Sequence, residues 1–166
     1  MEFNKTYILT LKIDDESQKF FNQQRKLHFP PAINYLEAHL TLFHKLPLAD
    51  YITESLSNLS QKPFELEVVK PINIGNGVAY SLKSPTLNDL HKHLSNVFNA
   101  DLIPQDKQGY RPHITIQNKV AAVHASALLA KIQAEFNPFM VSAKGLDLWY
   151  YLGGPWEHVS TFVFID

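Results

Sequence analysis

The sequence of 166 residues contains no cysteine. This absence excludes disulfide bonds, a thiol nucleophile and thiolate zinc sites, and it fits a cytoplasmic protein. No stretch of the chain approaches the length of apolar sequence that crosses a bilayer, and Met1–Lys5 lack the basic and apolar regions of a secretory signal. The sequence therefore predicts a cytoplasmic protein that has no membrane partner.

An excess of positive charge is also missing. The 15 Lys and Arg are balanced by 16 Asp and Glu, which gives a net charge of −1. A protein that binds a long polyanion through many phosphates usually carries a strong basic excess. We therefore expect any nucleic-acid partner to be a small nucleotide or a short RNA end. The chain is expected to act as a monomer.

One short pattern is present twice, as His39-Leu40-Thr41-Leu42 and His113-Ile114-Thr115-Ile116. In an extended strand, residues two apart point to the same face, so each histidine emerges beside its threonine while the apolar residues pack behind them. Random placement of the histidines and threonines would give roughly 0.3 such triplets. A lysine also follows each histidine by six residues, at Lys45 and Lys119.

The order of the predicted elements repeats as well. Strands are predicted over 6–13, 35–44, 63–69, 78–83 and 111–118, with another opening at 138 and a final hairpin of 146–151 and 158–165; helices are predicted over 15–26, 48–59, 85–99 and 120–136. The two motif histidines are 74 residues apart, and the Pro-Phe pairs at 63–64 and 138–139 are 75 residues apart. The same five elements therefore occur twice in one order.

This repeat predicts an α+β fold with a duplicated, two-lobed architecture and pseudo-two-fold symmetry. Antiparallel sheets are expected to flank a central groove, with the helices outside. A repeat of two units does not make a solenoid. Residues 1–166 are therefore expected to form a single domain, whose halves are approximately 1–74 and 75–166.

The two motifs supply groups that suit a phosphodiester. Cleavage needs a nucleophile deprotonated on one side of phosphorus and a leaving oxygen protonated on the other, and two histidines near neutral pH provide both states. The hydroxyls of Thr41 and Thr115 can donate to the non-bridging oxygens. Neither a metal nor another cofactor is required. Because both motifs carry the same residues, the sequence does not assign the acid and the base to His39 or His113.

In these paired motifs the chain resembles the 2H phosphoesterase superfamily, which includes 2′,5′-RNA-ligase-like proteins and cyclic nucleotide phosphodiesterases. The second copy, Arg111-Pro112-His113-Ile114-Thr115, resembles the family pattern most. The resemblance implies catalytic roles for His39 and His113 and phosphate binding by Thr41 and Thr115. Gln117-Asn118-Lys119 stands where related bacterial sequences often have an arginine, which leaves the subfamily open.

Other residues extend the expected site. Arg111 shares a face with His113 and is one of only two arginines, so we expect it to bind the substrate phosphate. Alternation along the strands and the need for aromatic platforms under a base give further candidate substrate contacts. These are Phe43, Lys45, Tyr110, Lys119, Tyr151 and Trp156.

The leading hypothesis is a metal-independent phosphoesterase that hydrolyses a 2′,3′-cyclic phosphate or a 2′,5′-linked nucleotide or RNA end. An alternative is the joining of RNA ends by the reverse reaction, since the same groups serve when a ribose hydroxyl replaces water. A second alternative is a noncatalytic module that binds nucleotides. Turnover of cyclic nucleotides would separate these hypotheses.

Overall fold

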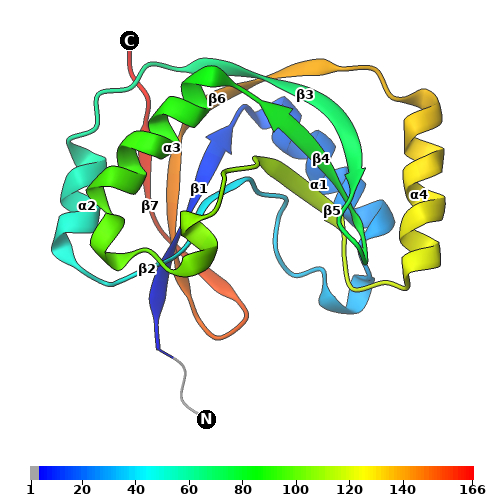
Figure 1. The fold of residues 1–166 in the computed structure, drawn as a ribbon, viewed down its shortest axis with the longest axis horizontal. Coiled ribbons are helices and arrows are strands. Elements are labelled where there is room, and N and C mark those ends of the chain that lie inside the picture. The colour runs from blue at the N-terminus through cyan, green and yellow to red at the C-terminus, as the bar shows by residue number, and fades with distance from the viewer. Residues whose placement is uncertain (1–3) are drawn as a thin grey trace.

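A single curled, seven-stranded antiparallel sheet dominates the computed structural model, which describes residues 4–166 (Figure 1). In chain order the elements are β1 (Thr6–Ile13), α1 (Asp15–His28), β2 (Thr41–Leu46), α2 (Asp50–Ser57), β3 (Phe64–Asn73), β4 (Val78–Lys83), α3 (Pro85–Val97), β5 (His113–Gln117), α4 (Ala122–Glu135), β6 (Phe139–Tyr151) and β7 (Trp156–Val163). Every strand pair is antiparallel. The predicted α+β class is confirmed.

The strand order reflects the repeat in the sequence. The sheet runs β2-β1-β6-β3-β4-β5, and β7 pairs with β6 outside this path. If β1 is exchanged with β4, β2 with β5 and β3 with β6, the result is the same strand order read from its other end. The topology is therefore compatible with two equivalent halves, while a two-fold axis in space stays a prediction.

The strands form one sheet, not the separate sheets that the sequence analysis expected. β3 and β6 are 10 and 13 residues long, and each is long enough to pair with two partners in succession. Their first residues pair with each other, 64–68 with 139–143, and their later residues pair with β4 and β1. β3, the third strand of the first half, therefore pairs with β4 and β6 of the second half, and β6 pairs with β1 and β3 of the first half. The assignment of 1–166 to one two-lobed domain stays a prediction.

β6 is one continuous strand, although the sequence analysis expected two separate strands in this region. Its first part pairs with β3, and from Gly145 onward the same edge pairs with β7. A Cβ atom on Gly145 would lie 2.6 Å from the carbonyl oxygen of Phe162. The absence of a side chain at Gly145 thus allows β7 to approach where β6 changes partner.

The helices also cross between the halves. Asp14 caps α1 by accepting a hydrogen bond from the amide of Ser17, which fixes the start of the helix. Phe21 of α1 is fully buried and packs edge-on against Tyr80 of β4, with ring centroids 5.6 Å apart. Phe20 is 39% exposed and packs edge-on against Phe21, with ring centroids 5.1 Å apart. α1 therefore packs against strands of the second half.

The strand of the first motif begins later than predicted, at Thr41 instead of Tyr35. Side chains of α1 form hydrogen bonds with the backbone of the segment that precedes β2. The amide of Ala38 donates to Asn22 Oδ1, and Gln18 donates to the carbonyl of Ala38, both at 2.8 Å. These hydrogen bonds hold the segment against α1, whereas the prediction placed it in a strand. His39 follows this segment and lies just before the start of β2.

Candidate active site

Both His-x-Thr motifs lie at the beginning of an edge strand. β2 and β5 are the two ends of the sheet order, His39 stands two residues before β2, and His113 is the first residue of β5. His113 pairs with Ser81 and Thr115 with Ala79 on β4, so the two motif side chains share a face of the sheet. The predicted juxtaposition within the second motif is therefore present.

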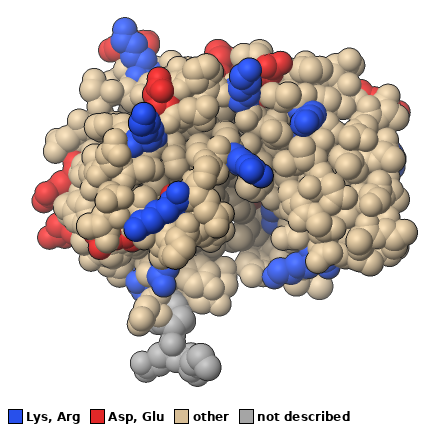
Figure 2. Space-filling view, viewed as in Figure 1, with Lys and Arg blue, Asp and Glu red and all other residues tan. Residues whose placement is uncertain are grey.

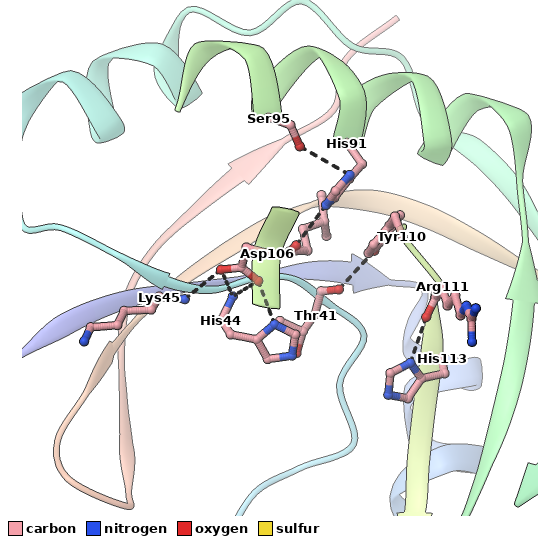
Figure 3. A network of polar contacts seen from close by, with 10 residues as sticks. Thr41, His44, Lys45, His91, Ser95, Asp106, Tyr110, Arg111 and His113 are labelled. Atoms are coloured by element: carbon pink, nitrogen blue, oxygen red, sulfur yellow. Dashed lines mark hydrogen bonds and ion pairs between the residues drawn. The ribbon is translucent and has the colours of Figure 1, made fainter. Parts of the chain in front are cut away.

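The two imidazole rings are held in the same way. Nδ1 of His39 lies 2.8 Å from the carbonyl oxygen of Glu37, and Nδ1 of His113 lies 2.8 Å from the carbonyl oxygen of Arg111. Figure 3 shows the contact of His113. A carbonyl oxygen only accepts, so each Nδ1 carries a hydrogen and donates it. Neither Nε2 has a hydrogen-bond partner among the described residues. Each motif thus presents one nitrogen that is free to exchange a proton.

The motif threonines combine a fixed backbone with a free hydroxyl. Tyr110 donates from its hydroxyl to the carbonyl of Thr41 at 3.0 Å, and Arg25 donates from its guanidinium to the carbonyl of Thr115 at 3.2 Å. Neither threonine hydroxyl has a hydrogen-bond partner within residues 4–166. The hydroxyls are available as donors to a ligand, and the strand positions that carry them are braced by other elements.

Electrostatics distinguish the two histidines. Desolvation in its recess lowers the pKa of His39 to about 4, and the residue as a whole is half-buried. Positive charge on Arg25, His113 and His44 lowers the pKa of His39 further, while its bond to Glu37 opposes the shift. That the two imidazoles face one phosphate across the site stays a prediction. His39 is therefore neutral at neutral pH, and His113 is exposed.

Charges are unevenly distributed although the total is nearly balanced. The space-filling view shows a hollow near the middle of one face, with Lys and Arg side chains around it (Figure 2). Asp and Glu on that face lie mainly at its left and upper margins. The surface therefore offers local positive charge for an anion despite the net charge of −1.

Two cavities adjoin the motif histidines. One, of about 520 Å³, is lined by His39 together with Trp149 and Trp156. The other, of about 500 Å³, is lined by Arg111 and His113. Arg111 thus lies beside His113, as expected for the same strand, and Trp156 lies beside His39, while contact of either residue with substrate stays a prediction. The Trp156 ring lies 4.6 Å from the His39 ring.

Comparisons with known proteins fit this arrangement. The family model of the 2′-5′ RNA ligase superfamily matches residues 13–155. The chain belongs to the 2′-5′ RNA ligase superfamily. The resemblance to the 2H phosphoesterases that the motifs indicated is thereby confirmed. No functionally curated protein matches the chain.

Solved structures of low sequence identity share the superfamily fold. Escherichia coli LigT in complex with 3′-AMP has a TM-score of 0.65 and 16% identity over 98% of this chain and 99% of LigT. A structure described as a phosphoesterase gives the same score and identity, over 98% of this chain and all of its own. The protein TT0787 of Thermus thermophilus has a TM-score of 0.64 and 14% identity, over 96% of this chain and 97% of its own.

The prediction that Phe43 contacts substrate is wrong. Thr41 and Phe43 pair with Thr10 and Leu9, which are adjacent on β1, so Leu42 forms a bulge between them. The bulge turns Phe43 to the face opposite Thr41. Phe43 is fully buried, with its ring stacked 4.7 Å from that of His91. Phe43 therefore belongs to the hydrophobic core of the protein.

A second bulge in β2 separates Lys45 from the motif. His44 and Lys45 together lie opposite Ile8, and the buried Asp106 accepts hydrogen bonds from both of their amides. Figure 3 shows the Lys45 side chain on the far side of His44 from Arg111 and His113. The structure thus places Lys45 away from the second motif, and the predicted alternation fails there too.

The remaining predicted contacts have other positions. The Tyr110 hydroxyl is committed to Thr41 and its ring stacks 3.7 Å from that of His91, and burial raises its pKa. Lys119 follows β5 in the left-handed region, with φ of 60°, and Tyr151 pairs with Trp156 across the β6–β7 hairpin. Tyr110 therefore braces the site, while substrate contact by Lys119 and Tyr151 stays a prediction.

Sequence reasoning missed Arg25 as a residue of the site. This buried side chain of α1 joins Asn34, just before the first motif, to the Thr115 carbonyl of the second. Its charge also acts on His39. The signal available in the sequence was its rarity, since only two arginines occur.

The part of the chain that the structure describes shows neither a metal centre nor a membrane span. Residues 4–166 contain no group of three or more His, Asp or Glu placed to hold a metal ion. Nor does any described helix have the length and apolar character needed to span a membrane.

Proposed function

We propose that this protein is a phosphoesterase that hydrolyses a 2′,3′-cyclic phosphate or a 2′,5′-linked nucleotide by two-histidine acid–base catalysis. One observation carries the proposal: both motif imidazoles donate from Nδ1 to the carbonyl two residues before them, which leaves both Nε2 atoms free. Matched acid and base groups beside free threonine hydroxyls suit displacement at phosphorus. Membership in the 2′-5′ RNA ligase superfamily supports the same chemistry.

The lowered pKa of His39 supports the role of base for this residue. Its Nε2 accepts a proton from water while the water oxygen forms a bond to phosphorus. The bond between phosphorus and the ribose oxygen breaks, and that oxygen takes a proton from Nε2 of His113. Both histidines then exchange protons with solvent to restore the starting states. The surroundings of each histidine have to decide which is the acid and which is the base, because the two motifs have the same residues.

The threonines and Arg111 stabilise the phosphoryl oxygens in this proposal. The free hydroxyls of Thr41 and Thr115 donate to the non-bridging oxygens, where charge must be neutralised. Arg111 lines the cavity beside His113 and supplies a charged donor on that side. No step requires a metal ion, so turnover is expected to persist in excess EDTA.

Joining of RNA ends is the second candidate, favoured by the description of the superfamily as 2′-5′ RNA ligases. The same groups run the reverse step when a ribose hydroxyl takes the place of water. The net charge of −1 favours small substrates, which places hydrolysis first.

A substrate panel tests both candidates. The protein is incubated with 2′,3′-cyclic mononucleotides and with short 2′,5′- and 3′,5′-linked oligomers, with and without EDTA, and products are separated by chromatography. Hydrolysis that survives EDTA is expected. Loss of all turnover in EDTA, restored by a divalent ion, would overturn the metal-independent mechanism. Binding without turnover of any substrate would favour a noncatalytic nucleotide-binding module.

A further inference from the structure

The strand of the first motif has two bulges on an edge of the sheet. Among the described strands, β1 alone pairs with β2, and the bulges lie at Leu42 and at the pair His44 and Lys45. A bulge contains a residue whose backbone groups the partner strand does not match. When such groups are buried, they need other hydrogen-bond partners, because an unpaired carbonyl or amide destabilises the fold. Side chains from distant parts of the chain can therefore determine the course of β2.

Side chains from α3 and from the segment that follows it supply these partners. Nε2 of His91 lies 3.2 Å from the carbonyl oxygen of Leu42, and this nitrogen donates because a carbonyl oxygen only accepts. Asp106 accepts from the amide of His44 at 2.9 Å and from the amide of Lys45 at 3.2 Å. Each bulge of β2 thus has its own side-chain partner from the second half of the chain.

The ring of His91 is held on both faces and at its second nitrogen (Figure 3). It lies between the rings of Phe43 and Tyr110, with centroids 4.7 and 3.7 Å away and interplanar angles of 9° and 2°. The hydroxyl of Ser95 lies 3.4 Å from Nδ1, which accepts because Nε2 carries the hydrogen. Desolvation by burial lowers the pKa of His91, so the ring is neutral at neutral pH. The orientation of the donor toward Leu42 is therefore fixed.

The bulge at Leu42 determines which side chains of the first motif face the site. Leu42 and Phe43 are both buried, although neighbours in a regular strand point to opposite faces. Thr41, just before the bulge, is half-buried and has a free hydroxyl. His39 is fixed in another way, because the residue before it is hydrogen-bonded to side chains of α1. A change at His91 is therefore expected to displace the Thr41 hydroxyl and to leave the imidazole of His39 in place.

We propose that His91 is a positioning residue for the first motif: by holding the Leu42 carbonyl, it fixes the bulge that turns the Thr41 hydroxyl toward the phosphate. The inference rests on the proposed function, in which this hydroxyl donates to a phosphoryl oxygen. His91 lines neither of the cavities beside the motif histidines, so it acts through the backbone of β2. Misplacement of a reacting group by about 1 Å can cost on the order of 10²-fold in rate.

His91→Phe removes the donor and keeps an aromatic ring between the two neighbouring rings. Kinetics on a 2′,3′-cyclic mononucleotide should show kcat lowered on the order of 10-fold with KM nearly unchanged, because the Thr41 hydroxyl acts mainly in the transition state. His91→Gln should keep kcat within about threefold, since the glutamine amide nitrogen can donate from the place of Nε2. His93→Phe is the matched control, because His93 is exposed on the same helix.

A double-mutant cycle separates positioning from a general loss of stability. If His91 acts through Thr41, adding His91→Phe to Thr41→Val should change kcat by less than about twofold, because no hydroxyl is left to misplace. Added to Thr115→Val, the same change should still lower kcat on the order of 10-fold. The acidic limb of the pH profile should not move in His91→Phe, because His39 keeps its place. A merely structural role predicts equal losses in the two threonine variants.

The outcomes keep the two proposals apart. Absence of turnover in the wild-type protein would overturn the proposed function, and the positioning role with it. Turnover in the wild type with unchanged kcat in His91→Phe, or with equal losses in the two threonine variants, would overturn the positioning role alone.

A second pair of variants decides the question if His91→Phe fails to fold. His91→Gln and His91→Asn both introduce an amide, but the shorter asparagine side chain does not reach the Leu42 carbonyl. We expect kcat on the order of 10-fold lower in the asparagine variant than in the glutamine variant. Equal kcat in the two variants would contradict the role of the His91 donor.

Discussion

The first and second His-x-Thr motifs carry the same residues in different surroundings. Both imidazoles are oriented by the carbonyl two residues before them, and both threonine carbonyls are held by a side chain from another element. His39, however, lies in a recess beside Trp156 and under the influence of the buried Arg25, whereas His113 is exposed. The repeated motif therefore supplies the same groups twice, and the surrounding elements give them different environments.

This difference has a chemical consequence. A general base must be neutral before the reaction and a general acid must be protonated, so two equal histidines would compete for either role. Desolvation and like charge lower the pKa of His39 and remove it from this competition. The asymmetry of the two environments thus gives the proposed reaction a direction, with His39 as base and His113 as acid.

The largest effects are expected from removing the histidines. His39→Ala and His113→Ala should each lower turnover of a cyclic nucleotide by ~10²–10⁴-fold, since each removes one proton transfer. A nitrophenyl phosphodiester sharpens the comparison, because its leaving group needs no proton. With that substrate, His113→Ala should lower turnover by less than about 10-fold, whereas His39→Ala should lower turnover as much as it does with the cyclic nucleotide.

Steady-state kinetics on both substrates measure this difference. If each variant lost the same fraction of turnover with both substrates, the assignment of His39 as base and His113 as acid would be contradicted. Near-wild-type turnover in both folded variants would remove two-histidine catalysis altogether.

The threonine hydroxyls should give the next largest effect. Thr41→Val and Thr115→Val keep the shape of the side chain and delete one donor, which can cost on the order of 10²-fold where charge develops on a phosphoryl oxygen. The loss should fall mainly on kcat, because the donor acts most strongly in the transition state. Thr53→Val on the exposed surface of α2 serves as the control. A change confined to KM would assign the hydroxyls to ground-state binding.

The pH dependence of kcat/KM should show the environment of His39 directly. A base with a pKa of about 4 stays neutral as pH falls through 6.5, so the acidic limb should appear only near pH 4. Arg25→Gln removes one of the charges that lower this pKa, and it should move the limb upward by on the order of half a pH unit. Arg25→Lys keeps the charge and should leave the limb in place. An acidic limb near 6.5 in the wild type would contradict the assignment.

The smallest expected effect concerns stability. The pKa of His39 is lower in the folded protein than its ordinary value of 6.5, so the unfolded chain binds a proton that the folded chain does not. Stability should therefore be fully present above pH 6.5 and decrease as pH falls toward 4. In His39→Gln this decrease should be shallower, though not absent, because burial also lowers the pKa of His28 and His91. Urea unfolding midpoints across this range provide the measurement, and parallel curves for the two proteins would contradict it.

Much of the fold was predictable because the repeat and the local patterns agree. The starts of α1 and α3 lie at their predicted positions, since Asp14 caps the first helix and Pro85 opens the second. The predictions failed where strands depart from strict alternation. Two bulges in β2 bury Phe43 and turn Lys45 away, and one bulge in β7 brings His158 beside Thr161. Bulges depend on the pairing partner, which the sequence of one strand does not specify.

By itself, the sequence determined the chemical groups and the family: two His-x-Thr motifs in an α+β chain without cysteine or charge excess. It also determined that His113 would emerge beside Thr115, because alternation acts within a few residues of one strand. Only the tertiary structure decided which histidine is desolvated, which carbonyls Arg25 and Tyr110 hold, and which residues line the cavity beside His39. Solvation and electrostatic interaction depend on everything that surrounds a group, and those neighbours come from distant parts of the chain.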